Sequence, residues 1–332
     1  MRVVITGGAG FVGRKLAARF LTEGEAVGPD GARGRLDELV LFDMAEPVPA
    51  LAPDKRLKLV TGDIADRATV EALITPATTT VIHLAAVVSA VAEADLDMGL
   101  RVNLDGTRTV LEACRKLERP PRVLFASSLA VYGGEPPLSV DEHTPPAPRT
   151  SYGAQKAAGE LLVADYSRRG LIDGRSVRLP TIVVRPGRPN KAATTLASSI
   201  LREPLAGFAT NCPVTPDTRM VILSPRRLVD CLMTVHDLPT ARLGFERTVL
   251  LPGINPTVGE MVEALGRAGG RAAVDRITWE HDTHIQKIVN GWPMTLAADR
   301  AAALGLAADR SIDEIIAAFM ADDLADQKKL YA

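Results

Sequence analysis

Short apolar runs and longer stretches with helical periodicity follow one another along the first part of the chain. The apolar runs, which are typical of strands covered on both faces, lie at residues 3–6, 39–42, 57–61, 81–84, 122–125 and 177–184. Between them, apolar residues recur at helical spacing from residue 11 onward and over residues 66–74, 96–117 and 152–168. This alternation predicts an α/β fold with a doubly wound parallel sheet.

The remaining stretches predict loops and a second, smaller lobe. Glycines and charges between 24 and 38, and prolines and acids between 133 and 150, predict two long loops, the second a candidate flap. Pro180 predicts a break in its strand, because proline cannot donate to a strand ladder. Beyond residue 187 the pattern predicts helices near residues 191–203, 225–237, 257–268, 281–290 and 311–323, and short strands near 220–223 and 248–251. We expect one domain over 1–187, to which later segments return, and a mostly helical lobe over 188–332.

Local signals place individual side chains within these elements. Asp66 and Ser151 are candidate caps of the helices that follow them, because short polar side chains accept hydrogen bonds from the first helical N–H groups. His83 lies inside an apolar run, where a histidine with satisfied hydrogen bonds is more common than a catalyst. His281 and His284 are spaced for one helix face, but no third ligand is evident, so we expect no metal site.

A glycine-rich turn directly follows the first apolar run. Gly7, Gly8, Gly10 and Gly13 separate the strand at 3–6 from the helix that begins near Phe11. Glycines allow the tight reversal and the close approach of a pyrophosphate, which the N–H groups and dipole of the helix N-terminus favour. A glycine-rich turn that binds no ligand would show the same glycines. Its position between strand and helix favours a dinucleotide site.

Two acids at strand ends indicate which dinucleotide the turn would bind. Asp43 ends the second apolar run, where an acid binds the adenosine ribose hydroxyls and repels a 2′-phosphate, so NAD is favoured over NADP. A solvated acid at a strand end is the plain alternative. Asp63 follows the third run and can reach the adenine amino group. The small residues Ala85 and Ala86, after the fourth run, would let the chain pass beneath the cofactor.

Three residues are candidates for a catalytic role. Tyr152 and Lys156 are four residues apart on a predicted helix and therefore share one face. A free tyrosine titrates near about 10, and a nearby ammonium lowers that value, so the pair can act as a base. Lys156 can also hold the nicotinamide ribose. Ser128, at the end of the preceding strand, can hydrogen-bond a substrate oxygen.

Overall composition excludes several classes of function. The chain has 332 residues and a net charge of −1, which gives no reason to expect nucleic acid or an anionic membrane surface as a partner. Its three cysteines, Cys114, Cys212 and Cys231, lie far apart and predict reduced thiols rather than a disulfide framework. We found neither a signal peptide nor an apolar stretch of membrane-spanning length, so we expect a cytoplasmic protein.

Several motifs together resemble the extended short-chain dehydrogenase/reductases of the NAD-dependent epimerase/dehydratase family. They are TGGAGFVG at 6–13, GDI at 62–64, HLAA at 83–86, SSLAVYG at 127–133 and YGAQK at 152–156. The resemblance covers essentially the whole chain and implies a Rossmann-like fold, bound NAD and a C-terminal substrate lobe. It implies Ser128, Tyr152 and Lys156 as the catalytic set. The residues it implies for cofactor binding are Gly7, Gly10, Phe11, Val12, Gly13, Asp43, Asp63, Ile64, Leu84, Ala85, Ala86, Asn103, Tyr152, Lys156 and Pro180.

Within that family the segments 85–108, 170–191 and 223–230 are most similar to D-erythronate dehydrogenases. The similarity implies NAD-dependent oxidation of the C2 hydroxyl of a small sugar acid. Arg185 or Arg188 would bind the carboxylate, since a guanidinium can pair with it through two hydrogen bonds. An ordinary surface charge is the alternative for either arginine. The further candidates for substrate contact are Ser89, Ser127, Ser128 and Tyr152.

Three alternatives remain at the level of sequence. A nucleotide-sugar epimerase of the UDP-glucose 4-epimerase kind would use Arg226 or Arg227 to hold a diphosphate. A uronate dehydrogenase would share the catalytic residues. A non-enzymatic NAD sensor would need the glycines but not Ser128, Tyr152 and Lys156.

Two helical stretches predict a homodimer. The stretches near 100–117 and 152–168 carry apolar residues on more than one face. One face must pack on the sheet, and the other could pair with a second subunit in a four-helix bundle. A fully buried helix would give the same pattern.

Overall fold

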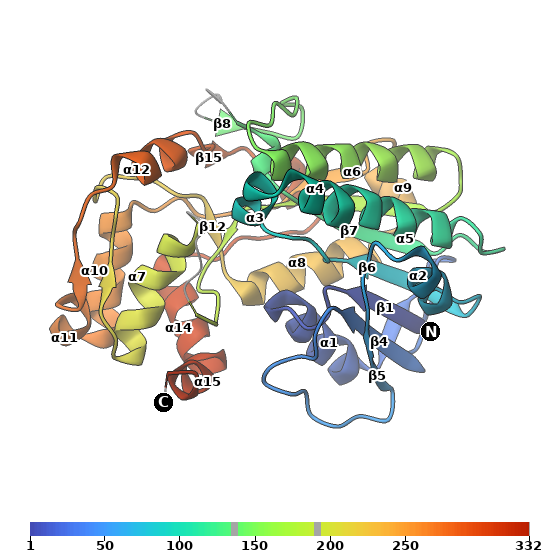
Figure 1. The fold of residues 1–332 in the computed structure, drawn as a ribbon, viewed down its shortest axis with the longest axis horizontal. Coiled ribbons are helices and arrows are strands. Elements are labelled where there is room, and N and C mark those ends of the chain that lie inside the picture. Colours follow the sequence, from blue (N-terminus) through green and yellow to red (C-terminus); the bar gives the residue numbers. More distant parts are fainter. Residues whose placement is uncertain (134–138, 189–193, 332) are drawn as a thin grey trace. The chain divides into compact units, whose positions relative to one another are not determined.

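The computed structural model of the protein describes residues 1–133, 139–188 and 194–331 and divides into two compact units (Figure 1). The first unit contains Met1–Val131, Pro148–Arg178 and Val229–Leu250, and the second contains Tyr132–Ala147, Leu179–Leu228 and Leu251–Ala332. The boundary that we placed at residue 187 falls inside the second unit. Val229–Leu250 is the later segment that returns to the first unit.

The first unit is built on a seven-stranded sheet with the order β13-β9-β7-β6-β1-β4-β5. Its strands are β1 (Arg2–Thr6), β4 (Glu38–Asp43), β5 (Leu57–Thr61), β6 (Thr78–His83), β7 (Arg122–Ser128), β9 (Asp173–Leu179) and β13 (Thr248–Leu250). Every pair of these strands with a defined register is parallel. The predicted doubly wound α/β fold is confirmed. Parallel order brings the carboxyl ends of β1, β4, β6 and β7 to one edge of the sheet.

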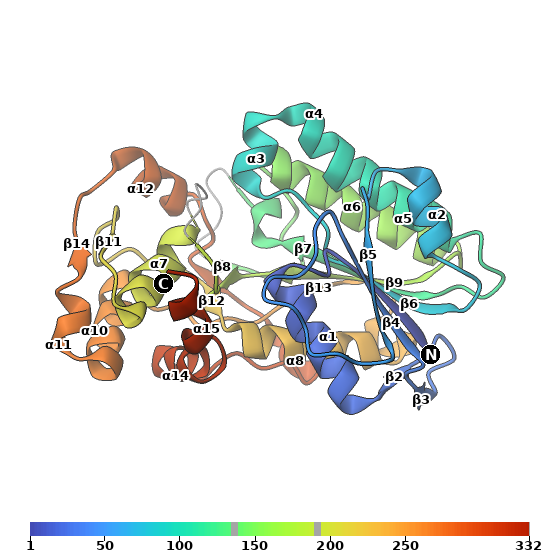
Figure 2. The ribbon, with the colours of Figure 1, turned by 60° about the horizontal axis from the view of Figure 1, so that its bottom comes forward.

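Helices cover both faces of this sheet (Figure 2). On one face lie α1 (Phe11–Glu23) and α8 (Pro225–Asp237), and Phe20 and His236 pack edge to face between them. The other face carries α2 (Arg67–Leu73), α5 (Gly106–Cys114) and α6 (Ser151–Arg168), with α3 (Ser89–Ala94) and α4 (Leu96–Gly99) beside α6. The strands and α5 contribute a buried apolar core that includes Val4, Val81, Val110 and Phe125.

Three local expectations for the first unit were wrong. The predicted loop at 24–38 contains an antiparallel hairpin, β2 (Glu25–Val27) and β3 (Arg33–Arg35). The continuous helix expected over 96–117 is interrupted by a π-helix, η1 (Leu100–Asp105). Thr150 rather than Ser151 caps α6, and its side chain accepts a hydrogen bond from the Gly153 N–H. Asp66 does cap α2, as predicted.

The second unit contains five longer helices and several two-residue strands in its described part. The helices are α7 (Thr195–Ala206), α10 (Val258–Gly269), α12 (Thr283–Asn290), α14 (Ile312–Asp322) and α15 (Leu324–Lys329). Ile200, Met261, Leu265 and Ile315 lie in its apolar core. Residues 134–138 of the predicted flap and 191–193 of a predicted helix lie outside the described residues.

Small parallel pairs connect the strands of the second unit. β10 (Thr181–Ile182) pairs with β12 (Ile222–Leu223), so the chain does break at Pro180, between β9 and β10. β8 (Ser139–Val140), inside the predicted loop at 133–150, pairs with β15 (Thr295–Leu296). Among the helices of the described ranges, none combines the length and the apolar character needed to cross a membrane.

Candidate active site

The glycine turn after β1 packs tightly against neighbouring segments of the first unit. Gly7 has a φ of +70°, in the left-handed region that favours glycine. A Cβ on Gly7 would lie 2.7 Å from the backbone N of Ala85, and a Cβ on Gly13 would lie 2.6 Å from the carbonyl O of Gly7. Both positions therefore need glycine, and the turn brings the start of α1 close to the segment that follows β6.

Asp43 and the N-terminus of α1 flank this turn. The N-cap residue of α1 is Gly10, so no side chain caps this end of the helix. Phe11 and Val12 lie in the first helical turn. Asp43 accepts hydrogen bonds from the N–H groups of Ala9 (3.0 Å) and Met44 (2.7 Å). A bare helix N-terminus favours a phosphate anion, and an acid beside it suits the adjoining ribose.

Asp63 is paired with a residue that the sequence did not single out. One carboxylate oxygen accepts a hydrogen bond from the Ala65 N–H (2.9 Å), and the other pairs with Arg101 on η1. The Ala65 N–H and the Arg101 guanidinium hold the pKa of Asp63 below its usual range. The side chain of Ile64 is buried in the core of the first unit, which leaves only its backbone for an adenine.

Asn103 holds the segment that follows β6. Its amide oxygen accepts a hydrogen bond from the Val87 N–H (2.9 Å), and its amide nitrogen donates to the Val87 carbonyl (3.2 Å) and to the side chain of Gln155 (2.8 Å). Leu84 is held at the other end of the segment by the Thr6 carbonyl (3.0 Å). Asn103 thus links the π-helix, α6 and the stretch that contains Ala85 and Ala86.

Tyr152 and Lys156 lie on one face of α6, as predicted. The Lys156 Nζ is 5.7 Å from the centre of the Tyr152 ring and 4.8 Å from that of Phe125, and it donates to the Ala126 carbonyl (2.8 Å). Burial lowers the pKa of Lys156 to about 8, while the charge of Glu160 acts in the opposite direction. The ammonium is therefore fixed beside the phenol and is close to the pH range in which it loses its proton.

His83 is a core histidine, as the sequence indicated. Its two ring nitrogens lie 2.7 Å from the Thr6 hydroxyl and 2.9 Å from the Thr107 hydroxyl. Burial, and secondarily the charge of Lys156, lower the pKa of His83 to about 3. The imidazole is thus neutral near pH 7 and is held by both hydroxyls within the core.

Ser127 and Ser128 face opposite ways at the end of β7, because successive residues of a strand alternate between its faces. Ser128 is half-buried, and its Oγ accepts a hydrogen bond from the Ala130 N–H (3.1 Å). Ser127, which we expected to contact a substrate, is buried and donates to Glu160 (2.5 Å). The structure therefore assigns Ser127 to the interior of the unit.

The start of α6 lies directly against the chain that follows Ser128. A Cβ on Gly153 would lie 2.0 Å from the carbonyl O of Ala130, which belongs to the short 3-10 helix Leu129–Val131. Because Gly153 has no Cβ, the helix that carries Tyr152 can lie close to the segment that carries Ser128. A glycine inside YGAQK has a packing reason that its motif alone does not reveal.

The remaining candidates belong to different units. Ser89 is the first residue of α3 in the first unit, and Pro180, Arg185 and Arg188 belong to the second unit. Arg185 donates to the Thr194 hydroxyl (3.3 Å), and Arg188 donates to the Leu330 carbonyl (3.0 Å). The backbone between these arginines is fixed by the Gln327 side chain, which accepts from the Gly187 N–H (2.7 Å) and donates to the Gly187 carbonyl (3.0 Å).

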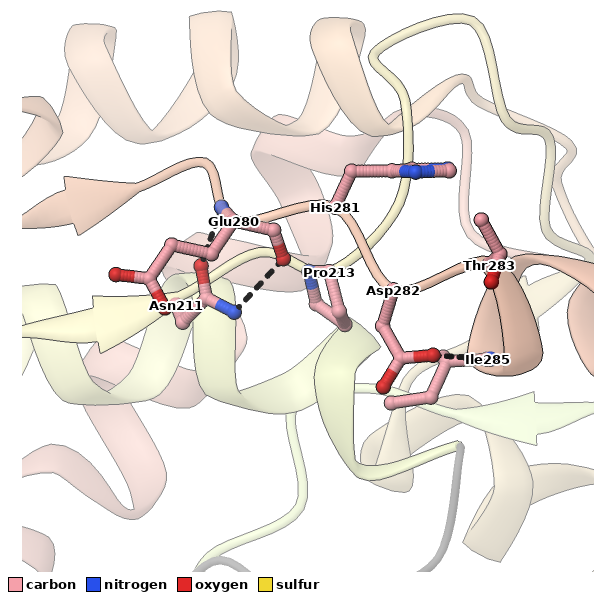
Figure 3. A pocket seen from close by; sticks show the side chains of 7 residues that line it. All are labelled: Asn211, Pro213, Glu280, His281, Asp282, Thr283 and Ile285. Carbon is pink, nitrogen blue, oxygen red and sulfur yellow. Dashed lines mark hydrogen bonds between the residues drawn. The ribbon is translucent and has the colours of Figure 1, made fainter.

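A pocket of the second unit contains none of the predicted site residues (Figure 3). It is lined by Asn211, Pro213, Glu280, His281, Asp282, Thr283 and Ile285. The Asn211 side chain bonds both the N–H and the carbonyl of Glu280, and the Asp282 carboxylate caps α12. Several of its polar groups thus serve the local fold, whereas Ser128, Tyr152 and Lys156 lie in the first unit.

The chain is similar over nearly its full length to two curated enzymes, each named D-erythronate dehydrogenase. It is 51% identical to that of Cupriavidus necator, covering 97% of this chain and 98% of the relative. It is 40% identical to that of Haemophilus influenzae, covering 98% and 100%. The likeness to both enzymes therefore extends over both units of the chain rather than over the first unit alone.

Solved structures and a family model extend the comparison. A crystal structure from Agrobacterium tumefaciens, named a nucleoside-diphosphate-sugar epimerase, superposes with a TM-score of 0.91 at 39% identity, covering 98% of this chain and 95% of that one. Residues 3–217, which include the glycine turn, Asp43 and the Tyr152–Lys156 pair, match the model of the NAD dependent epimerase/dehydratase family. The resemblance indicated by the sequence motifs is confirmed: this chain belongs to the NAD dependent epimerase/dehydratase family.

Proposed function

We propose that this protein oxidises the C2 hydroxyl of D-erythronate to give 2-dehydro-D-erythronate, with NAD as the oxidant. The observation that carries the proposal is the near-full-length likeness to two D-erythronate dehydrogenases. The placement of Tyr152 and Lys156 on one face of α6, with Ser128 on the neighbouring strand, supports an oxidoreductase rather than a sensor.

The glycine turn fits NAD. Gly7 and Gly13 leave no room for a Cβ, and the α1 N-terminus beside them favours the pyrophosphate. Asp43 would accept hydrogen bonds from the adenosine ribose and would repel the extra phosphate of NADP. When bound, NAD supplies the acceptor for the hydride that leaves C2.

Tyr152 is the proposed base. Its phenolate removes the proton of the C2 hydroxyl, and the Lys156 ammonium favours the phenolate by its charge. Lys156 is anchored through the Ala126 carbonyl, so this charge is held in place. The Ser128 hydroxyl would donate to the substrate oxygen and hold it for the proton transfer. Arg185 or Arg188 would pair with the carboxylate of the sugar acid.

A nucleotide-sugar epimerase is the second candidate, because one similar solved structure carries that name. Such an enzyme would need a cation for the diphosphate, and Arg226 and Arg227 were the sequence's candidates. Both already pair with carboxylates of the second unit, Arg226 with Asp322 (2.7 Å) and Arg227 with Glu314 (3.2 Å). These pairs reduce the positive charge available for a diphosphate and favour the dehydrogenase.

Incubation with NAD and single substrates separates the two candidates. We expect NADH to accumulate with D-erythronate and not with erythritol, which has the same chain length but no carboxylate. Interconversion of UDP-sugars without accumulation of NADH would overturn the proposal in favour of the epimerase. Oxidation of a uronate at a kcat/KM higher than that of D-erythronate would replace the substrate while keeping the reaction.

Replacing Gly153 by alanine is expected to lower kcat strongly. The new Cβ would overlap the Ala130 carbonyl, so α6 must move away from the segment that carries Ser128. A displacement of about 1 Å at a reacting group costs on the order of 10²-fold in rate. Steady-state kinetics with NAD and D-erythronate measure the effect. Ala154→Ser, at the exposed neighbouring position, is the control, and equal kcat values for both variants would contradict the packing argument.

We also propose a homodimer formed through the helices around α6. Leu161 on α6 is 73% exposed and Leu96 on α4 is 54% exposed, and α4 contacts α6. Apolar side chains this exposed on adjacent helices suit an isologous interface, in which the same patch of a second copy covers them.

Leu161→Glu is therefore expected to produce a monomer. A buried, unpaired carboxylate on both copies would oppose association. Light scattering coupled to size-exclusion chromatography measures the mass. Phe245→Glu, at another highly exposed apolar side chain of the first unit, is the control and should leave the dimer intact. A Leu161→Glu dimer would exclude this interface.

A further inference from the structure

A buried ion pair lies beside the proposed catalytic residues. Glu160 is on α6, one helical turn after Lys156. Arg178 is near the carboxyl end of β9. The Arg178 Nε is 3.0 Å from one oxygen of Glu160 and its terminal nitrogen is 2.7 Å from the other. The exposed fractions of the two side chains are 5% and 7%. Paired geometry of this kind fixes the carboxylate firmly within the unit.

The same carboxylate is connected to the end of β7. Ser127 donates to Glu160 (2.5 Å), while Lys156 donates to the carbonyl of Ala126 (2.8 Å). Glu160 and Lys156, four residues apart on α6, thus hold two successive residues of one strand. The next residue of that strand is Ser128, so the pair fixes the strand end that presents the proposed substrate hydrogen bond.

Lys156 is buried, and a buried ammonium is stabilised by a negative charge nearby. Its side chain is 2% exposed, and burial alone makes the ammonium less stable relative to the neutral amine. His83 on β6 is neutral, with both ring nitrogens bonded to threonine hydroxyls. Tyr152 on α6 is the group whose phenolate the ammonium favours, and Arg178 on β9 is in direct contact with Glu160. Among these groups Glu160 provides the negative charge that favours the cationic form.

We propose that Glu160, fixed by Arg178 and Ser127, is a positioning residue that keeps Lys156 cationic and holds the Ser128 end of β7 against α6. This inference rests on the proposed roles of Tyr152 and Lys156. Glu160 acts through these neighbours and does not touch the reacting atoms. Without its charge, Lys156 loses its proton at lower pH, its positive charge no longer favours the phenolate, and less phenolate is present.

The test is Glu160→Gln, which keeps the side chain's shape and an oxygen that accepts from Ser127. The first readout needs no substrate: it is the absorbance of tyrosinate as pH rises. The protein has four tyrosines, so subtraction of a Tyr152→Phe variant in each background isolates Tyr152. We expect the Tyr152 phenolate of Glu160→Gln to form at higher pH than that of the wild type. A charge change worth one pKa unit corresponds to about a tenfold change in the phenolate fraction.

The second readout is the pH profile of kcat/KM for D-erythronate. In Glu160→Gln the decline at alkaline pH, which reports loss of the Lys156 proton, is expected to move to lower pH. Asp165→Asn removes an exposed carboxylate from the same helix and should leave both readouts unchanged. A uniform loss of activity at every pH, with an unchanged tyrosinate titration, would show a structural role and overturn the proposal.

A double variant distinguishes the loss of the Glu160 charge from misfolding of the protein. Glu160→Gln removes the carboxylate that pairs with the buried Arg178, and Glu160→Gln/Arg178→Met removes the guanidinium charge as well. The double variant should fold and still show the delayed tyrosinate signal, and a wild-type signal would overturn the proposal. If the wild type fails to oxidise D-erythronate but the tyrosinate shift is observed, the proposed substrate fails and the role of Glu160 stands.

Discussion

Replacing Tyr152 by phenylalanine should lower kcat for D-erythronate by about 10²–10⁴-fold, the contribution expected of a positioned general base. The variant keeps the ring near Lys156 and loses only the phenolic oxygen that is the proposed acceptor of the substrate proton. The glycine turn and Asp43 are the proposed main contacts of NAD, so the dissociation constant for NAD should change little. Steady-state kinetics and calorimetric titration with NAD measure the two effects separately.

Ser128→Ala is a suitable companion to Tyr152→Phe. It removes the hydroxyl proposed to hold the substrate oxygen and leaves the base in place, so its pH profile should keep the wild-type shape at a lower rate. A Tyr152→Phe enzyme that retains most of its kcat would show that another group removes the proton. A large loss of NAD affinity would instead assign Tyr152 mainly to cofactor binding.

Replacing Arg175 by methionine should lower the free energy of unfolding by about 2–6 kcal/mol, because two buried carbonyl acceptors would each be left unsatisfied at a cost of about 1–3 kcal/mol. Arg175 is fully buried, pairs with Asp173 and donates to the carbonyls of Val235 (2.8 Å) and Leu238 (3.0 Å). These carbonyls lie at the end of α8, where helical acceptors have no partner within the helix. Burial lowers the pKa of Arg175 to about 10, so it remains charged at neutral pH.

Denaturant unfolding of the Arg175→Met protein measures this loss. Arg168→Met is the matched control, because Arg168 pairs with Asp165 on the surface and is 56% exposed. Surface pairs contribute about 0–1 kcal/mol, so the control should be nearly as stable as the wild type. Equal stability of the two variants would mean that α8 does not depend on the buried guanidinium for its anchoring.

Elements that depend on local chemistry could be predicted from the sequence. The strand at 57–61, the Asp66 cap and the chain break at Pro180 each follow from a few neighbouring residues. The hairpin at 24–38 was missed because its glycines and charges are equally typical of loops. The π-helix at Leu100–Asp105 was missed because helical periodicity does not reveal the local change in hydrogen bonding.

The same distinction applies to the candidate site. Tyr152 and Lys156 are four residues apart, so helix geometry alone places them together. Arg101 pairs with Asp63 from 38 positions away, and Arg178 pairs with Glu160 across two elements. No local sequence pattern predicts such partners, because they come into contact only in the folded protein. The inward direction of Ser127 follows from strand alternation, but only once the end of β7 is known.

The measurement that tests the central claim most directly uses D-erythronate carrying deuterium at C2. Incubated with NAD and the enzyme, it should yield 2-dehydro-D-erythronate and one equivalent of NADH that contains the deuterium, both identified by mass spectrometry. This result would establish the oxidised carbon, the product and the hydride acceptor together. Unchanged substrate, deuterium retained in an epimerised product, or unlabelled NADH would contradict the account.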